Sequence, residues 1–442
     1  MGTTRRDFLK ASAMLAASTA GTFSPMLAAR AFAQSDDLAN MSGCKETPTL
    51  IAIYLRGGAD PLSTMIPFGD DLYYRMRPTI AVPQQSQDGR RGILRLNNYW
   101  GFHPAAAPLV ELFRQDLLTT IMCVGSKHPT RSHFDAQDFM ERAAPGIKTV
   151  TEGWLNRYLS LTQKSDDHPL RAIAMQSILP RSLRGQYPVA VMPRSNAESV
   201  AAPFASLYAC EEGAMQSSEA KGKTHLIGSD QPKNADENKQ RIMQAGYQGV
   251  QRVKRINELM RSRESKSEYP SGGLGPKLRQ LAKIINIDQK LEVAGVDYNG
   301  WDHHAYQGST GGIMARMLDN LSQSIGAFVT DIGPHINNTV ILVMSEFGRT
   351  VKENGNNGSD HGHGGFMMAI GGPVAGGKVM GKWSGLQRRN LYQGRDLPVH
   401  VDFRDVFASV LTGLFSFDHE AHDFFPKYSA DNKYLKLFKT NA

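Results

Sequence analysis

Histidines and acidic residues gather in a few short polar segments of this 442-residue chain. Five of the 13 histidines lie in three such segments, together with several carboxylates. Imidazole and carboxylate side chains bind zinc, manganese and iron, and carboxylates also bind calcium. The pattern therefore predicts a site for one of these divalent ions. The imidazoles and carboxylates of these segments include those of Asp60, His133, Asp135, Asp302, His303, His304, Glu346, His361 and His363.

The longest polar segment is SEFGRTVKENGNNGSDHGHGG, at residues 345–365. It follows TVILVM, a short apolar run rich in β-branched residues that predicts a buried strand. Gly362 and Gly364, beside the two histidines, let the backbone turn sharply and approach a ligand closely. The same letters also fit a glycine-rich turn with surface histidines, and Glu346 with Arg349 also fits an ordinary ion pair. Each motif is weak by itself, so the prediction depends on where the fold brings them.

Apolar runs that predict buried strands precede the polar segments. They lie at residues 49–55, 117–125, 290–298 and 339–344, with a fifth at 365–372. Between them, amphipathic stripes at residues 105–115 and 318–332 predict helices. Strands and helices that alternate in this way favour an α/β fold, a largely parallel sheet with helices on both faces. Because ligands bind outside the carboxyl ends of such strands, we expect the polar segments to meet there.

A hydroxyl that could act as a nucleophile lies in SKHPTRSHFDAQDFMER, at residues 126–142. Its second part predicts a helix that begins with Ser132 as N-cap and Asp135 at the third position. Backbone N–H groups at a helix start stabilise an oxyanion, which favours Ser132 as nucleophile and His133 as ligand or proton carrier. A serine at an N-cap also needs no catalytic role. The nucleophile stays open among Ser126, Thr130 and Ser132.

The chain begins with the pattern of an exported precursor. Arg5 and Arg6 stand before a mildly apolar stretch, and the small residues at 31–33 offer a cleavage point. These parts, in this order, predict a twin-arginine signal peptide over residues 1–33. We therefore expect a periplasmic or extracellular protein whose partner in transit is the twin-arginine export machinery. No later run approaches the roughly 20 apolar residues of a membrane span, so no stable span is expected.

Charge and composition exclude a nucleic-acid partner. The formal net charge is +8, and removal of residues 1–33 would take away four positive charges and one negative charge. The remaining basic residues are scattered and lack the aromatic–basic interleaving of a nucleic-acid surface. The rest of the chain predicts a single α/β domain over residues 45–430, with a polar insertion at about 211–270.

Several motifs together are similar to one family. They are LRGGADPLSTMIP, RSHFDAQDFMER, GWDHHAYQ, the 345–365 segment and DFRDVFASVL. In combination they resemble the exported "domain of unknown function 1501" family, itself similar to a branch of the alkaline phosphatase/sulfatase superfamily. The resemblance runs from about residue 49 to about residue 426, and it implies an alkaline-phosphatase-like fold.

The superfamily plan, carried over position by position, implies roles for these residues. Asp60 would bind metal after the first strand, and Ser132 would be the nucleophile. Asp302 and His304 would bind one metal ion. The final histidine of the plan matches His361 or His363.

One departure from the plan concerns SEFG, which stands where relatives show SDHG. Glu346 would replace the aspartate, and Phe347 would replace the histidine. Since Phe347 cannot bind a metal, a second metal ion is either held by His133 with His361 or His363, or is missing.

Together these features predict an exported metal-dependent hydrolase of phosphate or sulfate esters, acting on a small-molecule or glycan ester. The metal would lower the pKa of a hydroxyl or water, and Ser132 and His133 would act beside it. Arg349, or else Arg56, would hold the ester anion with a two-pronged hydrogen bond. The alternative is a secreted, non-catalytic protein that binds a metal or a carbohydrate, with Trp301 holding the sugar.

Overall fold

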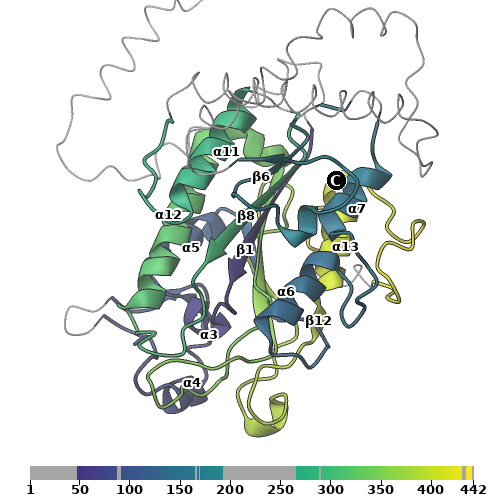
Figure 1. The fold of residues 1–442 in the computed structure, drawn as a ribbon. Helices are drawn as coiled ribbons and strands as arrows, with labels where there is room; N and C mark the ends of the chain where they lie inside the picture. The colour runs from purple at the N-terminus through teal and green to yellow at the C-terminus, as the bar shows by residue number, and fades with distance from the viewer. Residues whose placement is uncertain are drawn as a thin grey trace, which may run out of the picture. The chain divides into compact units, whose positions relative to one another are not determined.

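A mostly parallel sheet of nine strands runs through the described part of the chain (Figure 1). The computed structural model describes residues 47–86, 91–164, 167–168, 170–192, 265–287, 290–430 and 435–440. The expected signal peptide at 1–33 lies outside the described residues, as do residues 211–264 of the expected insertion. The strand order is β11-β5-β10-β9-β1-β8-β6-β7, and β12 pairs with β5.

All five expected strands are present in this sheet. They are β1 (Thr49–Arg56), β5 (Leu118–Gly125), β8 (Val293–Asn299), β9 (Thr339–Met344) and β10 (Gly365–Ile370). Shorter strands extend it: β6 (Ala172–Ala174), β7 (Ala190–Val191), β11 (Lys378–Met380) and β12 (Val401–Asp402). Among the described strands of this sheet, β10 alone is antiparallel to its neighbours, which are β5 and β9. The predicted largely parallel α/β fold is therefore confirmed.

Helices cover both faces of the sheet (Figure 1). On one side lie α5 (Ala107–Arg114), α11 (Gly275–Ile287) and α12 (Ile313–Ile332). On the other lie α6 (His133–Arg142), α7 (Trp154–Leu161) and α13 (Phe403–Phe415). Alternate residues of β1 point to the two sides: Ile51 and Ile53 pack with the first group, and Leu50 and Ala52 with the second. Each buried leucine or isoleucine contributes roughly 1.5–3 kcal/mol, which explains the unbroken apolar run.

A smaller layer follows β1 along the chain. It consists of α3 (Pro61–Thr64), α4 (Asp71–Met76) and a three-stranded sheet of β2 (Met65–Ile66), β4 (Gly101–Phe102) and β3 (Leu94–Arg95). None of the helices in the described ranges combines the length and the apolarity needed to cross a membrane.

The carboxyl ends of the parallel strands share one edge of the sheet. β1, β8 and β9 end there side by side, and β5 ends there two strands from β9. Because β10 runs the other way, it begins at this same edge, where Gly365 lies opposite Val124. The loops after β1, β5 and β8 and the loop that joins β9 to β10 therefore come together.

Candidate metal centre

Three loops at this edge bring three histidines and one aspartate together. His133 is the first residue of α6, after β5; Asp302 and His304 follow β8; and His361 precedes β10. His361 Nε2 lies 2.9 Å from Nε2 of His133 and 2.9 Å from Nε2 of His304. Asp302 Oδ1 lies 3.2 Å from His361 Nε2 and 3.1 Å from His304 Nε2. We call these four residues the cluster.

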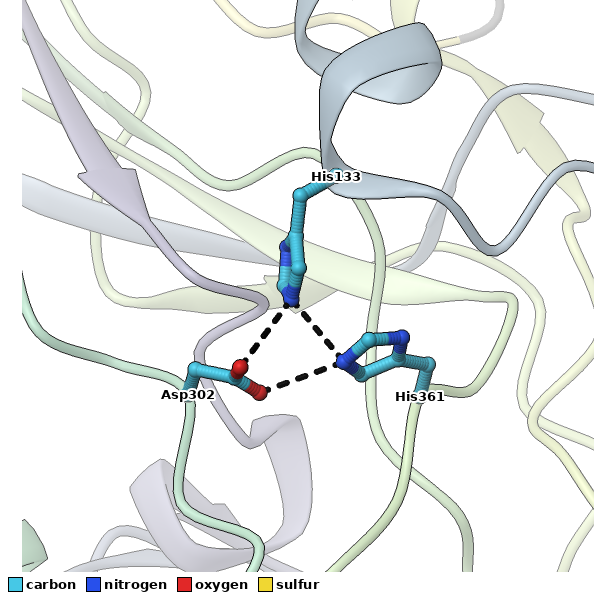
Figure 2. Close-up of side chains that lie close together, drawn as sticks. All are labelled: His133, Asp302 and His361. Carbon is cyan, nitrogen blue, oxygen red and sulfur yellow. Dashed lines mark hydrogen bonds and ion pairs between the residues drawn. The ribbon is translucent and has the colours of Figure 1, made fainter.

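Figure 2 shows His133, Asp302 and His361 pointing toward one another. Their ligand atoms all lie within 4.8 Å of one another, and His133 Nε2 is 3.4 Å from Asp302 Oδ2. Ligand atoms bound to a tetrahedral zinc at about 2.0–2.1 Å are about 3.3–3.4 Å apart. The spacing of His133, Asp302 and His361 therefore suits one ion of this size, and His304 Nε2 lies beside Asp302 and His361. Of the expected metal ligands, the structure brings Asp302, His304 and His361 together, with His133, which was expected as a ligand or proton carrier.

The outer ring nitrogen of each histidine has an acceptor of its own. His133 Nδ1 lies 2.8 Å from Glu346 Oε1, and His304 Nδ1 lies 2.8 Å from Asp360 Oδ1. His361 Nδ1 lies 2.9 Å from the carbonyl oxygen of Arg131. An ionised carboxylate or a carbonyl can only accept, so Nδ1 carries the hydrogen in each ring. In the neutral rings, the inward Nε2 atoms then present lone pairs, the arrangement typical of metal-binding histidines.

When all three rings are neutral, these lone pairs face one another without a proton donor between them. A neutral imidazole carries one hydrogen, and in His361 it is directed to the Arg131 carbonyl. His361 Nε2 nevertheless has two other Nε2 atoms and Asp302 Oδ1 within 3.2 Å. Acceptors crowded in this way repel one another unless a cation lies among them. The donor set, three imidazoles and a carboxylate, suits zinc or a similar transition metal.

The ionised carboxylate of the cluster attracts a cation, which is either a metal ion or a second proton on His133. Burial would raise the pKa of Asp302, but the hydrogen bond and charge of Arg349, followed by the charges of His304 and His133, lower it to about 2. Burial is the largest cause of the lowered pKa of His361, and the charge of His133 adds to it. The hydrogen bond to Glu346 raises the pKa of His133. At neutral pH the cluster therefore holds an ionised carboxylate and a neutral central imidazole.

Glu346, expected as a ligand, lies behind His133. Its Oε1 accepts from His133, from the Gln137 amide at 2.8 Å and from the Gly57 N–H at 2.9 Å. Its Oε2 accepts from the Ser345 hydroxyl at 3.0 Å. Burial would raise the pKa of Glu346, but the hydrogen bonds from His133 and Gln137 lower it. Glu346 thus orients His133 and does not itself reach the centre of the cluster.

Arg349, expected to hold a substrate anion, is fully buried. Its guanidinium donates to Asp302 and to carbonyl oxygens of the loops after β1, β8 and β9, which are those of Gly57, Gly58, Trp301 and Ser359. The structure therefore places Arg349 behind Asp302, where it fixes the carboxylate. Arg56, the other expected clamp, is held by Gln137, Glu141 and Asp297.

One family model matches most of the chain. It is described as "Protein of unknown function (DUF1501)", and it covers residues 47–423. The chain belongs to the DUF1501 family. A search of curated proteins gave no match.

Solved structures resemble this DUF1501 protein only distantly. The C-terminal periplasmic domain of EcEptC from Escherichia coli, in complex with Zn, is 10% identical over 74% of each chain, with a TM-score of 0.33. Ps i-CgsB in complex with k-i-k-neocarrahexaose is 11% identical over 86% of this chain and 74% of its own, with a TM-score of 0.37. The PsFucS1 sulfatase from Pseudoalteromonas sp. is 12% identical over 88% and 70%, with a TM-score of 0.35. At such TM-scores the likeness carries no argument about activity.

Asp60, another expected ligand in this DUF1501 chain, lies in a separate polar network. It caps α3 through the Leu62 N–H, and both carboxylate oxygens accept from Arg77. Ser63 and Gln307 donate to Oδ2 as well. Burial would raise the pKa of Asp60, but the charge and hydrogen bonds of Arg77 lower it. These partners make Asp60 part of a buried network that supports the fold, and Asp60 is not among the residues of the cluster.

His363 and Phe347 both pack against other rings. The ring of His363 stacks on Tyr392, with centroids 4.0 Å apart, and burial is the main cause that lowers its pKa to about 4. It is therefore a neutral packed side chain, apart from the converging Nε2 atoms. Phe347 lies against the rings of His133 and His361, at 4.9 and 5.1 Å between centroids. The phenyl ring of Phe347 thus packs on two of the candidate ligands.

Ser132 occupies the N-cap position of α6, as expected, but its side chain makes no capping hydrogen bond. It is exposed and directly precedes His133. The other two hydroxyls of this loop are engaged: Thr130 accepts from the Ser132 N–H at 3.2 Å, and Ser126 accepts from the His128 N–H at 3.1 Å. Ser132 is thus the least restrained of the three candidate nucleophiles.

Sequence reasoning did not assign roles to Gln137 and Asp360, which hold the histidines of this DUF1501 site. Gln137 follows His133 by one helical turn and bonds both Glu346 and Arg56. Asp360 directly precedes His361 and bonds His304. The i,i+4 spacing of His133 and Gln137 was the available signal, because such residues share a helix face.

Proposed function

We propose that this chain is an exported metal-dependent hydrolase of phosphate or sulfate esters. The observation that supports it is the cluster, where Nε2 atoms of three histidines meet the carboxylate of Asp302. An ion bound there would neutralise charge on an ester oxygen and lower the pKa of a hydroxyl or water. The motifs that resemble the alkaline phosphatase/sulfatase superfamily give the same reaction class.

Two groups of residues would form the site for this ion, one that binds it and one that orients the ligands. His133, Asp302, His304 and His361 would hold it directly. Around them, Glu346, Asp360 and the Arg131 carbonyl orient the three rings, and Arg349 orients Asp302. Partners of this kind fix the tautomer and raise the basicity of the ligand atom. The site is therefore preorganised, which favours tight binding.

Ser132 is our proposed nucleophile. It precedes His133 at the start of α6, where backbone N–H groups stabilise negative charge. An exposed hydroxyl next to a metal-binding imidazole could be deprotonated as an ester approaches. The phosphoryl or sulfuryl group would pass from the ester oxygen to the serine oxygen, and the alcohol would leave with a proton. Water would then attack the serine ester, releasing phosphate or sulfate and restoring the hydroxyl.

We also propose export by the twin-arginine route to the periplasm or beyond. The support lies in Arg5, Arg6 and the small residues at 31–33. Replacement of both arginines by lysine should leave the precursor in the cytoplasm. Unchanged export of that variant would refute this route.

A second function, metal binding without turnover, is favoured by one observation. Arg56 and Arg349 were expected to bind the substrate anion, but both guanidinium groups donate their hydrogen bonds to other groups of the protein. Trp301, expected in this alternative to hold a sugar, is fully buried and therefore cannot stack on one.

Metal analysis of the purified protein separates these possibilities. We expect bound metal in the wild type, loss of it in His361→Ala, and retention in His422→Ala, which alters an exposed histidine elsewhere. The same samples are then assayed with 4-nitrophenyl phosphate and 4-nitrophenyl sulfate. Metal with cleavage of either ester supports the hydrolase, and metal without cleavage supports the second function. Equal metal content in wild type and His361→Ala would refute both.

A further inference from the structure

Two large aromatic side chains beside the cluster are left in solvent. Phe134 follows His133 on α6 and is 91% exposed, and Tyr306 follows His304 by two residues and is 77% exposed. The Nε2 atoms of these two histidines both lie 2.9 Å from His361 Nε2, so each aromatic residue is close in sequence to a histidine of the cluster. An exposed aromatic ring offers a flat apolar face on which part of a ligand can pack.

The backbone of Tyr306 supports a role outside folding. Its φ is +50°, in the left-handed region that bulky residues adopt only at a cost. Two backbone hydrogen bonds hold this conformation. The Tyr306 N–H donates to the Asn356 carbonyl oxygen at 2.9 Å, and the Gln307 N–H donates to the Asn357 carbonyl oxygen at 2.9 Å. Residues in such conformations concentrate at ligand sites. The chain thus keeps a tyrosine where glycine or asparagine would fit more easily.

The loop that holds Tyr306 supplies exposed amide groups. Asn356 and Asn357 are both exposed. Among the described residues, the Asn356 amide has no hydrogen-bond partner, and Asn357 uses only its oxygen, toward the Thr79 hydroxyl. Each amide offers two N–H donors, and an amide oxygen accepts. Donors and acceptors therefore lie next to the exposed tyrosine ring.

This combination matches the chemistry of a sugar ring. A pyranose presents C–H groups on its flat face, which pack on the electron-rich face of an aromatic ring. Its edge presents hydroxyls, which both donate and accept hydrogen bonds, as amides do. A purely apolar ligand would make no hydrogen bonds with the amides, and a simple anion would not pack on the aromatic rings.

We propose that Tyr306, Phe134 and the amides of Asn356 and Asn357 form a subsite for the sugar that carries the ester. The inference rests on the proposed hydrolase function and names its substrate class: phosphate or sulfate esters of glycans. The aromatic rings would hold the sugar, and the ester would reach the cluster.

Binding can be measured without turnover, by affinity electrophoresis in gels that contain a polymer. The probes are dextran sulfate and a sulfated galactan, which carry sugar rings, and poly(vinyl sulfate), which has the anions without rings. The proteins are the wild type, Tyr306→Ala, Phe134→Ala and Tyr306→Phe. Leu161→Ala is the control, since Leu161 is an exposed apolar residue at the end of α7, away from the carboxyl edge.

We expect a sugar polymer to retard the wild type more than poly(vinyl sulfate) does at matched charge and physiological salt. Tyr306→Ala and Phe134→Ala should each raise the dissociation constant for the sugar polymer at least about fivefold. Tyr306→Phe and Leu161→Ala should match the wild type. Equal binding by wild type and both alanine variants, or equal retardation by ring-bearing and ring-free polymers, would overturn the proposal.

The result also separates this inference from the proposed function. Retardation by a sugar polymer that depends on Tyr306 but comes with no cleavage would support the subsite and contradict the hydrolase. Cleavage of an aryl ester at equal kcat/KM in wild type, Tyr306→Ala and Phe134→Ala, with no ring-dependent retardation, would support the hydrolase and overturn the subsite.

Discussion

Glu346 and His133 are joined by a hydrogen bond of 2.8 Å between Oε1 and Nδ1, although they belong to different loops. Glu346 is 1% exposed, and its other donors are Gln137, Gly57 and Ser345. A buried carboxylate in this position acts on a metal ion only through the imidazole. It makes that imidazole a better ligand, and it fixes the direction in which the ring points.

Glu346→Gln should therefore weaken metal binding without unfolding the protein. The variant keeps the size of the side chain but removes the charge that raises the pKa of His133. Loss of such a partner weakens metal binding about 10- to 100-fold. Competition with a chelator measures this affinity, and Glu111→Gln, at a helix surface, controls for charge. Unchanged affinity in Glu346→Gln would contradict the assigned role.

Asp60→Asn should destabilise the fold and leave the metal in place. Asp60 and Arg77 form a buried ion pair, with exposed fractions of 2% and 0% for their side chains. Removal of one partner of such a pair costs about 3–5 kcal/mol, since the other charge stays buried. Urea unfolding and metal content per folded molecule test this expectation. Loss of metal at unchanged stability would instead make Asp60 a ligand.

Ser132→Ala should change activity and leave stability alone. Since the Ser132 side chain makes no capping hydrogen bond, the loss of about 1 kcal/mol that is usual for a cap should be absent. Once an ester is found that the wild type cleaves, Ser132→Ala is assayed beside Thr130→Ala and Ser126→Ala. Full activity in Ser132→Ala would remove this serine from the mechanism.

Acid should weaken the fold partly through His103. The residue is fully buried; Nδ1 accepts from the Ala105 N–H, and Nε2 donates to the Ser309 carbonyl. Burial lowers its pKa, so the neutral ring is the folded form. His103 makes its full contribution to the free energy of unfolding above about pH 6.5, the pKa of the histidine in the unfolded chain. That contribution is lost as the pH falls through the lower pKa of His103 in the folded protein.

His103→Asn keeps an oxygen to cap and an amide to donate, but it does not titrate. Its unfolding free energy should therefore depend less on pH than that of the wild type. Urea unfolding at pH 7.5 and pH 5.5 measures both. The same pH dependence in the two proteins would contradict this assignment.

Tyr306→Asn should stabilise the fold while it removes the proposed sugar contact. Asparagine tolerates the φ of +50° better than tyrosine does. A gain of up to about 1 kcal/mol in the free energy of unfolding is expected. Thermal unfolding measures the gain, with Tyr306→Phe as the control that keeps the strain. A loss of stability in the asparagine variant would argue that the tyrosine ring packs in the fold.

The strands were predictable because β1 and β9 are apolar on both faces, which produces unbroken runs in the sequence. Because these strands were expected to run parallel, the polar segments that follow them were expected to meet at one edge of the sheet. The reversal of β10 was not predictable, since a short apolar run has no direction. That reversal is what places His361 at the carboxyl edge.

The division of carboxylates into ligands and supports could not be predicted. Asp60 and Asp302 both follow a strand and look alike in sequence. They differ in their partners: Arg77 and Gln307 surround Asp60, whereas Arg349 fixes Asp302 and leaves it facing three histidines. These partners come from distant segments, and only the folded chain shows them. The burial of Trp301 likewise depends on packing that its polar neighbours conceal.

The reversed direction of β10 also bears on how this family can vary. Residues 345–364 leave β9 and return to β10, and the two strands are neighbours at the same edge of the sheet. Both ends of the excursion are therefore anchored by one strand pair, and no helix has to cross over between them. Insertions and deletions that spare residues 356 and 357, whose carbonyl oxygens hold the backbone of Tyr306 and Gln307, leave both anchors in place. Over evolutionary time, length changes should accumulate in the rest of this excursion rather than in the segments between parallel strands, whose crossover helices would have to shift.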